Sequence, residues 1–251
     1  MTAAVLQTFD LHKSFGGITA TDHVDFTLAR GARHALIGPN GAGKTTFVNQ
    51  LTGVLQPSGG RIDLMGEDIT RLPREARVRR GLARTFQINQ LFASMTPLEM
   101  IALVTSERLG RGARPFHALD RDSELVAETA ELLSRFRLDD IMDQRIATLP
   151  YGKQRQIEIA AAFAAKPSVL LLDEPAAGVP EAERRELMST VAALPDDVSV
   201  LLIEHDMDLV FRFATRITVL VNGRVLAEGA PEEVARDRAV REAYLGEAEH
   251  V

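Results

Sequence analysis

The stretch that decides the fold reads Gly38-Pro39-Asn40-Gly41-Ala42-Gly43-Lys44-Thr45. It matches the G-x-x-x-x-G-K-[ST] pattern of a phosphate-binding loop at every fixed position. An apolar run ends at Ile37, and apolar residues recur at helical spacing from Phe47, so the loop joins a strand to a helix. Glycines let the backbone curl until successive N–H groups point at a phosphate chain beside the positive end of the helix. The stretch therefore predicts a nucleotide site.

Two side chains of this loop have specific roles in such a site. Lys44 brings an ammonium group to the β- and γ-phosphates, and the hydroxyl of Thr45 supplies a ligand for Mg²⁺. The alternative is a glycine-rich turn with a surface lysine. It requires four fixed positions, and the strand and helix around them, to coincide by chance.

Composition sets broad limits on the kind of protein. The 251 residues, 45% of them hydrophobic and 25% charged, are typical of a globular protein with one large or two small domains. A net charge of −6 argues against a nucleic-acid partner held on a broad basic face, although local arginine clusters stay possible. The absence of cysteine excludes disulfides and thiolate metal sites and is compatible with the cytoplasm.

No apolar stretch reaches the 18 residues of a membrane span, and the N-terminus lacks the features of a signal peptide. We expect a cytoplasmic chain that reaches a membrane only through a partner.

The first half of the chain changes character near residue 96. Before it, residues 5–9, 24–28 and 61–65 have strand patterns, and the arginine-rich residues 71–84 suggest a solvated helix face. After it, helical periodicity predicts a mostly helical insertion over residues 96–165, with a mobile loop at 110–115 and helices at 99–109, 124–136 and 156–165.

The second half contains the apolar runs of a buried parallel sheet. Continuous apolar residues at 169–172 and 198–203 predict strands buried on both faces, with a helix between them at 181–194. A hairpin about Asn222-Gly223 and a terminal helix over residues 231–245 complete the chain. Polar residues follow each buried strand, at the edge where open α/β sheets place their ligands.

These polar residues have candidate roles in nucleotide chemistry. Asp173 is placed to hold Mg²⁺ through water, and Glu174 to polarise an attacking water as general base. His205, after the next strand, would stabilise charge on the γ-phosphate. The alternatives are a surface turn for the two carboxylates and a hydrogen-bonded structural histidine. The other histidines show no metal-ligand spacing and are interpreted as background: His12, His23, His34, His117 and His250.

The order of these motifs resembles the nucleotide-binding subunits of ABC transporters over nearly the whole chain. The matching segments are the phosphate loop, Thr85-Phe86-Gln87, residues 149–155, Asp173-Glu174-Pro175 and Glu204-His205-Asp206. The resemblance implies an α/β P-loop NTPase fold, with a RecA-like core, an antiparallel β subdomain and an inserted α-helical subdomain. It implies one cassette over residues 1–251, in which 1–88 and 167–251 form the core and 89–166 form the helical subdomain with the signature loop.

The resemblance also assigns the site. Glu174, His205, Gln87 and Lys44 would be catalytic, and Thr45, Gln87 and Asp173 would hold Mg²⁺. Gln87, on its hinge loop, would bind the metal or the attacking water. ATP would be bound by Phe15, stacked on adenine, and by Gly38, Pro39, Asn40, Gly41, Ala42, Gly43, Lys44, Thr45 and Thr46. The signature loop that contacts the partner subunit's ATP would be Leu149, Pro150, Tyr151, Gly152, Lys153 and Gln154.

Details of the chain look like the ATPases of branched-chain amino acid importers, especially the longer of the two that such systems pair. They include Tyr151-Gly152, Pro175-Ala176-Ala177-Gly178 and Ala243-Tyr244-Leu245-Gly246-Glu247. That group implies a second ABC ATPase as homo- or heterodimer partner, integral membrane permease subunits, and a solute-binding protein reached indirectly. It implies a peripheral position on the inner face of the cell membrane and no nucleic-acid partner. The group also includes importers for amides, urea and aromatic compounds.

The chain departs from the family pattern in three places. The signature serine is replaced by Pro150, which lacks an N–H, so we hypothesise that Gly152, the following helix N-terminus and Lys153 contact phosphate instead. Pro180 stands in the D-loop where an acidic or amide residue is common, which predicts looser communication between the two sites. Phe15 replaces a tyrosine, keeping the π-face and losing the hydroxyl.

Two other functions fit parts of the pattern. A soluble ABC ATPase acting on nucleic acid or ribosomes usually has two cassettes or coiled-coil arms, whereas this chain has one cassette and no heptad run. A small phosphate-loop kinase would leave Gln87 and the signature segment without a role.

Overall fold

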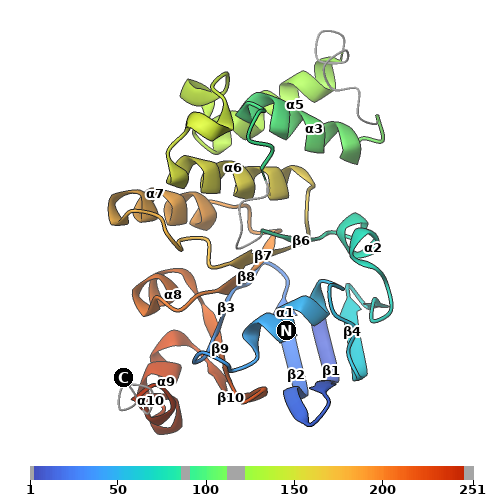
Figure 1. Ribbon diagram of the computed structural model, residues 1–251, viewed down its shortest axis with the longest axis vertical. Helices are drawn as coiled ribbons and strands as arrows, with labels where there is room; N and C mark the ends of the chain where they lie inside the picture. Colours follow the sequence, from blue (N-terminus) through green and yellow to red (C-terminus); the bar gives the residue numbers. More distant parts are fainter. Residues whose placement is uncertain (1–2, 86–90, 112–121, 246–251) are drawn as a thin grey trace. The chain divides into compact units, whose positions relative to one another are not determined.

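The computed structural model describes residues 3–85, 91–111 and 122–245, and they form two compact units (Figure 1). The first unit comprises Met1–Arg84, Ser168–Glu174 and Pro195–Val251, and the second comprises Thr85–Pro167 and Pro175–Leu194. The second unit thus includes residues 175–194 as well as the range predicted to be helical. The division of the chain into the predicted core and helical subdomain stays a prediction.

The first unit contains two sheets. The antiparallel sheet has the order β2-β1-β4-β5, formed by Ala4–Phe15 (β1), Ile18–Ala29 (β2), Gly59–Leu64 (β4) and Glu67–Asp68 (β5). The second sheet has the order β10-β9-β3-β8-β7-β6. Its strands are Arg33–Ile37 (β3), Leu82–Arg84 (β6), Val169–Asp173 (β7), Ser199–Ile203 (β8), Arg216–Val221 (β9) and Arg224–Gly229 (β10).

Five strands of the second sheet run parallel, and only β10 pairs antiparallel, with β9. Every residue of β7 and β8 is buried, as the continuous apolar runs predicted. Asn222 and Gly223 both have positive φ, 49° and 78°, the backbone that the predicted two-residue hairpin requires.

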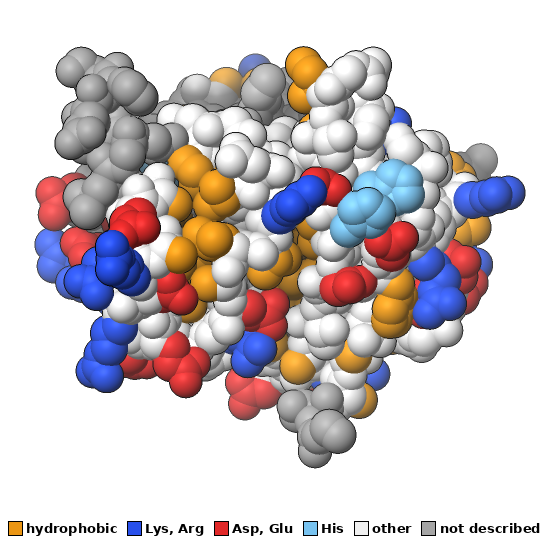
Figure 2. All heavy atoms as spheres, turned by 90° about the horizontal axis from the view of Figure 1, so that it is seen from below, with side chains coloured by type: hydrophobic (Ala, Val, Ile, Leu, Met, Phe, Trp, Pro, Cys, Tyr) orange, Lys and Arg blue, Asp and Glu red, His pale blue; other side chains and the backbone are white. Residues whose placement is uncertain are grey.

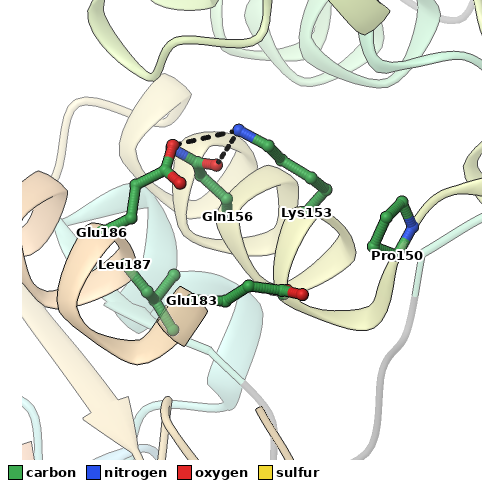
Figure 3. A pocket seen from close by; sticks show the side chains of 7 residues that line it. Pro150, Lys153, Gln156, Glu183, Glu186 and Leu187 are labelled. Atoms are coloured by element: carbon green, nitrogen blue, oxygen red, sulfur yellow. Dashed lines mark hydrogen bonds and ion pairs between the residues drawn. The ribbon is translucent and has the colours of Figure 1, made fainter. Parts of the chain in front are cut away.

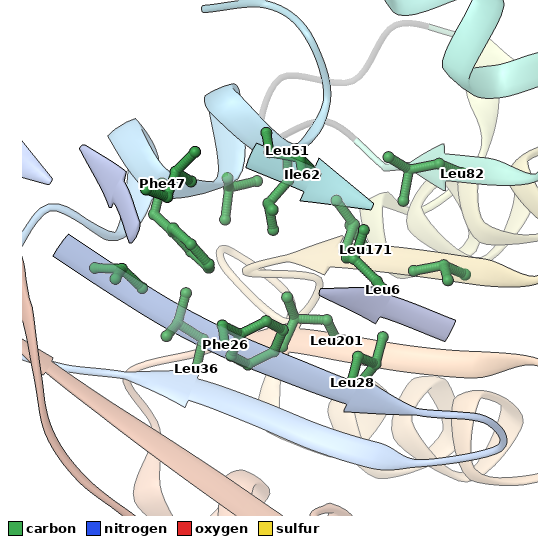
Figure 4. Packing of buried hydrophobic residues seen from close by; sticks show 14 of the residues in the cluster. Leu6, Phe26, Leu28, Leu36, Phe47, Leu51, Ile62, Leu82, Leu171 and Leu201 are labelled. Carbon is green, nitrogen blue, oxygen red and sulfur yellow. The ribbon is translucent and has the colours of Figure 1, made fainter. Parts of the chain in front are cut away.

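One hydrophobic core joins both sheets of this unit to the helix after the phosphate loop, Lys44–Leu51 (α1) (Figure 4). Phe47 of α1 meets the ring of Phe26 on β2 edge to face, with centroids 5.6 Å apart. Leu201 of β8 and Leu171 of β7 are fully buried in the same cluster. The core therefore fixes the start of α1 against the parallel sheet.

The short helix Arg74–Arg79 (α2) corrects one expectation, because its arginines do not all lie on a solvated face. Arg77 is 1% exposed and its guanidinium donates to the carbonyls of Gln50 and Leu51 at the end of α1, and to those of Thr70 and Leu72. Burial lowers the pKa of Arg77 to about 10. A cation at the carboxyl end of a helix satisfies carbonyls that have no helical partner.

The C-terminal part of the first unit has short helices, Met207–Phe213 (α8), Pro231–Arg236 (α9) and Arg238–Leu245 (α10). The single helix predicted over residues 231–245 is wrong, because Asp237 is extended (φ −64°, ψ 125°). Its carboxylate accepts the N–H groups of Ala239 and Val240 and so starts a new helix.

The described part of the second unit is helical. Its helices are Pro97–Arg108 (α3), Ser123–Arg135 (α5), Tyr151–Ala164 (α6) and Glu181–Ala192 (α7), with two short 3₁₀ turns at Asp139–Ile141 and Ile146–Thr148. Thr96 and Glu99 form a capping box at the start of α3. Among the described residues, no helix has the length and apolar content needed to cross a membrane.

Candidate functional site

The phosphate loop lies between β3 and α1, and at two of its glycines the neighbouring backbone leaves no room for a side chain. Gly38 and Gly43 have φ values of 153° and 98°. A Cβ atom on Gly38 would lie 2.1 Å from the carbonyl oxygen of Leu220, and one on Gly43 would lie 2.3 Å from that of Ala20. Side chains at these positions would push the loop away from β9 and β2, so the glycines fix the loop against the first unit.

Polar groups of the loop lie at the start of α1. The ammonium of Lys44 donates to the carbonyls of Gly38 and Pro39, the second at 2.9 Å, and so curls back over the loop. Thr45 is exposed and Thr46 is half-buried, both in the first turn of α1. Ala42 is buried and its carbonyl accepts the N–H of Gly223.

The two candidate carboxylates end β7. Asp173 is 8% exposed, and its Oδ2 lies 2.5 Å from Nη2 of Arg84. The same guanidinium donates from Nη1 to the amide oxygen of Asn49 on α1, at 2.7 Å. Glu174 follows in a left-handed backbone conformation (φ 44°), held by a hydrogen bond of 2.9 Å from its N–H to the carbonyl of Ile203. The left-handed conformation turns the chain sharply at Glu174, directly after the strand.

His205 lies on the loop after β8, beside Glu174. Its Nδ1 is 3.7 Å from Oε1 of Glu174 and 3.8 Å from Oε2 of Glu204. Glu204 is buried, and its carboxylate accepts the N–H groups of His205 and Asp206. The side chain of His205 is 68% exposed, which leaves the imidazole open to a ligand.

The signature residues occupy the N-terminus of α6 in the second unit. Residues 149–155 were predicted to be a loop, but α6 already begins at Tyr151, five residues before the predicted start. Pro150 precedes the first turn with φ −53°, close to the helical value that its ring imposes. Gln154 donates to the carbonyl of Leu149 at 2.9 Å, which closes the turn.

A hollow of about 210 Å³ lies between α6 and α7 (Figure 3). Lys153 is on its wall, with Nζ 3.1 Å from Oε1 of Glu186 and 3.2 Å from Oε1 of Gln156. Gly152 is buried there, and a Cβ on it would lie 2.0 Å from Oε2 of Glu183. The ammonium of Lys153 therefore has its partners inside the second unit.

Two candidate residues remain, Phe15 and Gln87. Phe15 ends β1 and is 49% exposed, with the ammonium of Lys13 5.2 Å from its ring centroid. Gln87 lies outside the described residues.

Sequence reasoning missed Arg84 and Asn49, which connect Asp173 to α1. Arg84 lies in the segment that was interpreted as a solvated face, and it is only 10% exposed. A β6 strand of three residues is too short to show periodicity, but a cation directly before Thr85-Phe86-Gln87 was an available signal.

Comparison with known proteins identifies the family. The profile of the ABC transporter family matches residues 21–177, which is more than half of the chain. The chain belongs to the ABC transporter family. As a member of this ATP-binding family it is an ATPase, as predicted. A second profile, of branched-chain amino acid ATP-binding cassette transporters, matches residues 224–250 of this ABC ATPase.

Relatives of this ABC ATPase extend over its whole length. It is 39% identical to the high-affinity branched-chain amino acid transport ATP-binding protein BraF of Pseudomonas aeruginosa, over 99% of this chain and 100% of that one. It is 36% identical to the probable branched-chain amino acid transport ATP-binding protein LivG of Archaeoglobus fulgidus, over 96% of this chain and 95% of the other. The predicted resemblance to this importer group is confirmed.

Solved structures agree with the fold. An ATP-binding cassette of an ABC transporter in its ADP conformation superposes with a TM-score of 0.83 at 30% identity, covering 98% of this chain and 100% of that one. A nucleotide-free cassette gives 0.81 at 29% identity, covering 96% and 99%. The predicted fold class is confirmed, and ATP binding follows from membership of the family.

Proposed function

We propose that this ABC ATPase drives an importer for branched-chain amino acids, or for related amino acids and amides. The observation that best supports ATP hydrolysis is the placement of Asp173 and Glu174 at the end of β7. This strand lies in the same parallel sheet as β3, the strand that leads into the phosphate loop. The solute class is supported by the names of the full-length relatives and by the match over residues 224–250. The alternative is a cassette that acts on nucleic acid or ribosomes, and neither of the two relatives named above has a description of that kind.

Phosphate binding would use the loop backbone and two side chains. The loop leads into the N-terminus of α1, where unpaired backbone N–H groups and the helix dipole favour negative charge. Lys44, now hydrogen-bonded to two loop carbonyls, would turn its ammonium to the β- and γ-phosphates. Phe15 offers an exposed π-face for the adenine.

The donor set fits Mg²⁺. Hard oxygen ligands suit this ion, and the exposed hydroxyl of Thr45 and the carboxylate of Asp173 supply them, with Gln87 as a further candidate. The bound ion would neutralise charge on the phosphates. Asp173 already holds a cationic group, the guanidinium of Arg84, so the pocket around this carboxylate accommodates positive charge.

Hydrolysis would use Glu174 as general base and His205 as the group that stabilises the γ-phosphate. Glu174 takes the proton of the attacking water, which places a hydroxide-like oxygen toward the γ-phosphorus. The imidazole of His205, 3.7 Å from that carboxylate, can donate to a phosphate oxygen. The left-handed backbone at Glu174 would set the position of the base next to Asp173, the proposed metal ligand.

A complete site would need a second cassette, identical or different, whose signature residues close over the nucleotide of the first. Gly152, the N-terminus of α6 and Lys153 are the groups we assign to that contact, because Pro150 has no N–H to offer. Permease subunits would hold the dimer on the inner face of the membrane, and a solute-binding protein would act through them.

Uptake in cells tests the proposal. Deleting the gene should abolish high-affinity uptake of labelled leucine, isoleucine or valine, or of a related amino acid or amide, and the wild-type chain should restore it. The tagged chain should be recovered from detergent extracts with an integral membrane permease. Recovery with ribosomes or DNA, together with unchanged uptake, would overturn the transport assignment.

A further inference from the structure

The β1–β2 hairpin carries a cluster of metal-type ligands that belongs to no part of the ATP site. Asp10 and His12 come from β1 and His23 comes from β2. One ligand atom from each of the three lies within 4.8 Å of the other two. Figure 2 shows histidine side chains beside carboxylates on the face that it draws. We propose that Asp10, His12 and His23 form a binding site for a divalent transition-metal ion of the zinc type.

The backbone is irregular where it brings the three side chains together. Asp10 and His23 both have left-handed conformations, with φ values of 52° and 51°. The β1–β2 pairing shifts register between Thr8 and Leu11, so an irregularity lies at Asp10. Such backbone is costly for residues other than glycine, with Asn, Asp and His the most tolerant. These two residues, one on each strand of the hairpin, bring their side chains into hydrogen-bond contact.

The carboxylate of Asp10 already holds one imidazole. Its Oδ1 is hydrogen-bonded to Nδ1 of His23, and this bond lowers the pKa of Asp10 and raises the pKa of His23. On the other side of the ring, Nε2 lies 3.7 Å from Oδ1 of Asp22. A metal ion would take the place of the proton that Asp10 and His23 share, because it too is a positive charge between the two groups.

The ring of His12 is oriented as in many metal sites. Its Nδ1 lies 3.2 Å from the carbonyl oxygen of Asp10 and can donate to it, which leaves the lone pair on Nε2 for a metal. Gly59 of β4 makes room for the ring, since a Cβ there would lie 2.2 Å from Cε1 and 2.6 Å from Nε2. The rings of His12 and His23 lie with centroids 5.3 Å apart.

Two imidazoles and one carboxylate are ligands that zinc and neighbouring divalent metals accept, with water in the fourth position. In a tetrahedral site the ligand atoms are about 3.4 Å apart. The hydrogen-bonded atoms of Asp10 and His23 are closer than this, so metal binding would move them apart. The exposure of the two side chains, 67% and 65%, leaves room for the rotations that this requires. The sequence interpretation had set these histidines aside, because the spacing of residues 10, 12 and 23 has no familiar metal pattern and the hairpin brings them together.

Titration calorimetry of the full chain with ZnCl₂, without nucleotide, tests the site. The variants D10N and H23N suit this purpose, because asparagine also tolerates the left-handed conformation and the hairpin is retained. H12Q removes the third ligand. The matched control is D25N, which changes the exposed carboxylate that accepts the N–H of Asp10 but supplies none of the three ligands.

The wild-type chain and D25N should bind one Zn²⁺ with micromolar or tighter affinity, and Zn²⁺ should raise their melting temperatures. D10N, H23N and H12Q should each lose about tenfold or more of this affinity and the accompanying thermal shift. Absence of binding by the wild-type chain at tens of micromolar Zn²⁺, or binding that H23N leaves unchanged, would show that Asp10 and His23 form only a hydrogen-bonded pair.

Discussion

Arg84 and Asp173 form an ion pair at the ends of the adjacent parallel strands β6 and β7, with Nη2 of the guanidinium 2.5 Å from Oδ2 of the carboxylate. Each side chain is 10% exposed. Asn49 of α1 accepts a second hydrogen bond from the same guanidinium, so the pair connects the phosphate-loop helix to the carboxylate proposed to hold Mg²⁺. Arg84 is therefore the counter-charge of Asp173 in this structure.

Removing Arg84 should leave Asp173 buried without its cation. We expect R84A to lower the free energy of unfolding by about 3 kcal/mol in metal-free buffer, as urea denaturation would measure. Adding Mg²⁺ with nucleotide should reduce the difference in unfolding free energy between R84A and wild type, because the ion supplies positive charge to the same carboxylate.

The matched control for R84A is R80A. Arg80 is paired with Glu67 at 2.9 Å, but the two side chains are 36% and 56% exposed, so the loss should stay below about 1 kcal/mol. Equal losses of unfolding free energy in R84A and R80A would show that the Arg84–Asp173 pair stabilises the protein no more than an exposed ion pair does.

Lys153 can contribute to ATP turnover only if its ammonium releases the carboxylate with which it is paired in the second unit. It is paired with Glu186 at 3.1 Å, on the wall of the hollow in Figure 3. We expect K153A to reduce ATPase turnover several-fold. E186Q, which weakens the competing pair and keeps the lysine, should leave turnover equal or higher. ATP affinity and turnover that K153A leaves unchanged would remove Lys153 from the proposed phosphate contact.

Sequence patterns predicted the parts of the fold that local sequence chemistry determines. The phosphate loop, the apolar strands β7 and β8, and the Asn222-Gly223 hairpin each follow from local chemistry, and the structure has all three. The burial of Arg77 and Arg84 could not be predicted in this way. Arginine is usually exposed, and only the folded chain shows which guanidinium faces helix carbonyls or a buried carboxylate.

The second limit on prediction from the sequence was knowing which residues distant in the chain meet in the fold. His205 and Glu174 were expected near one phosphate because both follow buried strands, and their 3.7 Å separation shows how parallel strands bring their carboxyl ends together. No such rule brings His12 to His23, since a hairpin with irregular register decides which side chains meet. The break at Asp237 was missed for a similar reason, because a capping carboxylate can start a new helix without any change in composition.

Replacing Glu174 with glutamine should separate binding from hydrolysis. Glutamine keeps the size and the hydrogen-bond acceptor but cannot take a proton, so E174Q should bind ATP normally while turnover falls by about 100-fold or more. The variant should also accumulate as an ATP-bound dimer, measured by size-exclusion chromatography with light scattering. D208N removes an exposed acid on α8 and should keep wild-type turnover. Near-normal hydrolysis by E174Q would exclude Glu174 as the base.

His34 should make the stability of the first unit depend on pH. The imidazole is 1% exposed on β3, with Nε2 2.8 Å from the hydroxyl of Thr218 and its ring 5.0 Å from that of Phe26. Burial lowers the pKa of His34 to about 4, below its ordinary value of 6.5. Between these values the unfolded chain binds a proton that the folded chain excludes. The stabilisation is therefore complete above pH 6.5 and is lost as the pH falls toward 4.

Urea denaturation at pH 7 and pH 5 measures this contribution. His34 should account for a loss of about 2 kcal/mol of unfolding free energy between the two values. The variant H34Q cannot titrate, so the unfolding free energy of wild type minus that of H34Q should fall by that amount between pH 7 and pH 5. Other groups titrate equally in both proteins and cancel in this comparison. Stability curves that stay parallel from pH 7 to pH 5 would contradict a buried neutral His34, whatever the cost of the substitution itself.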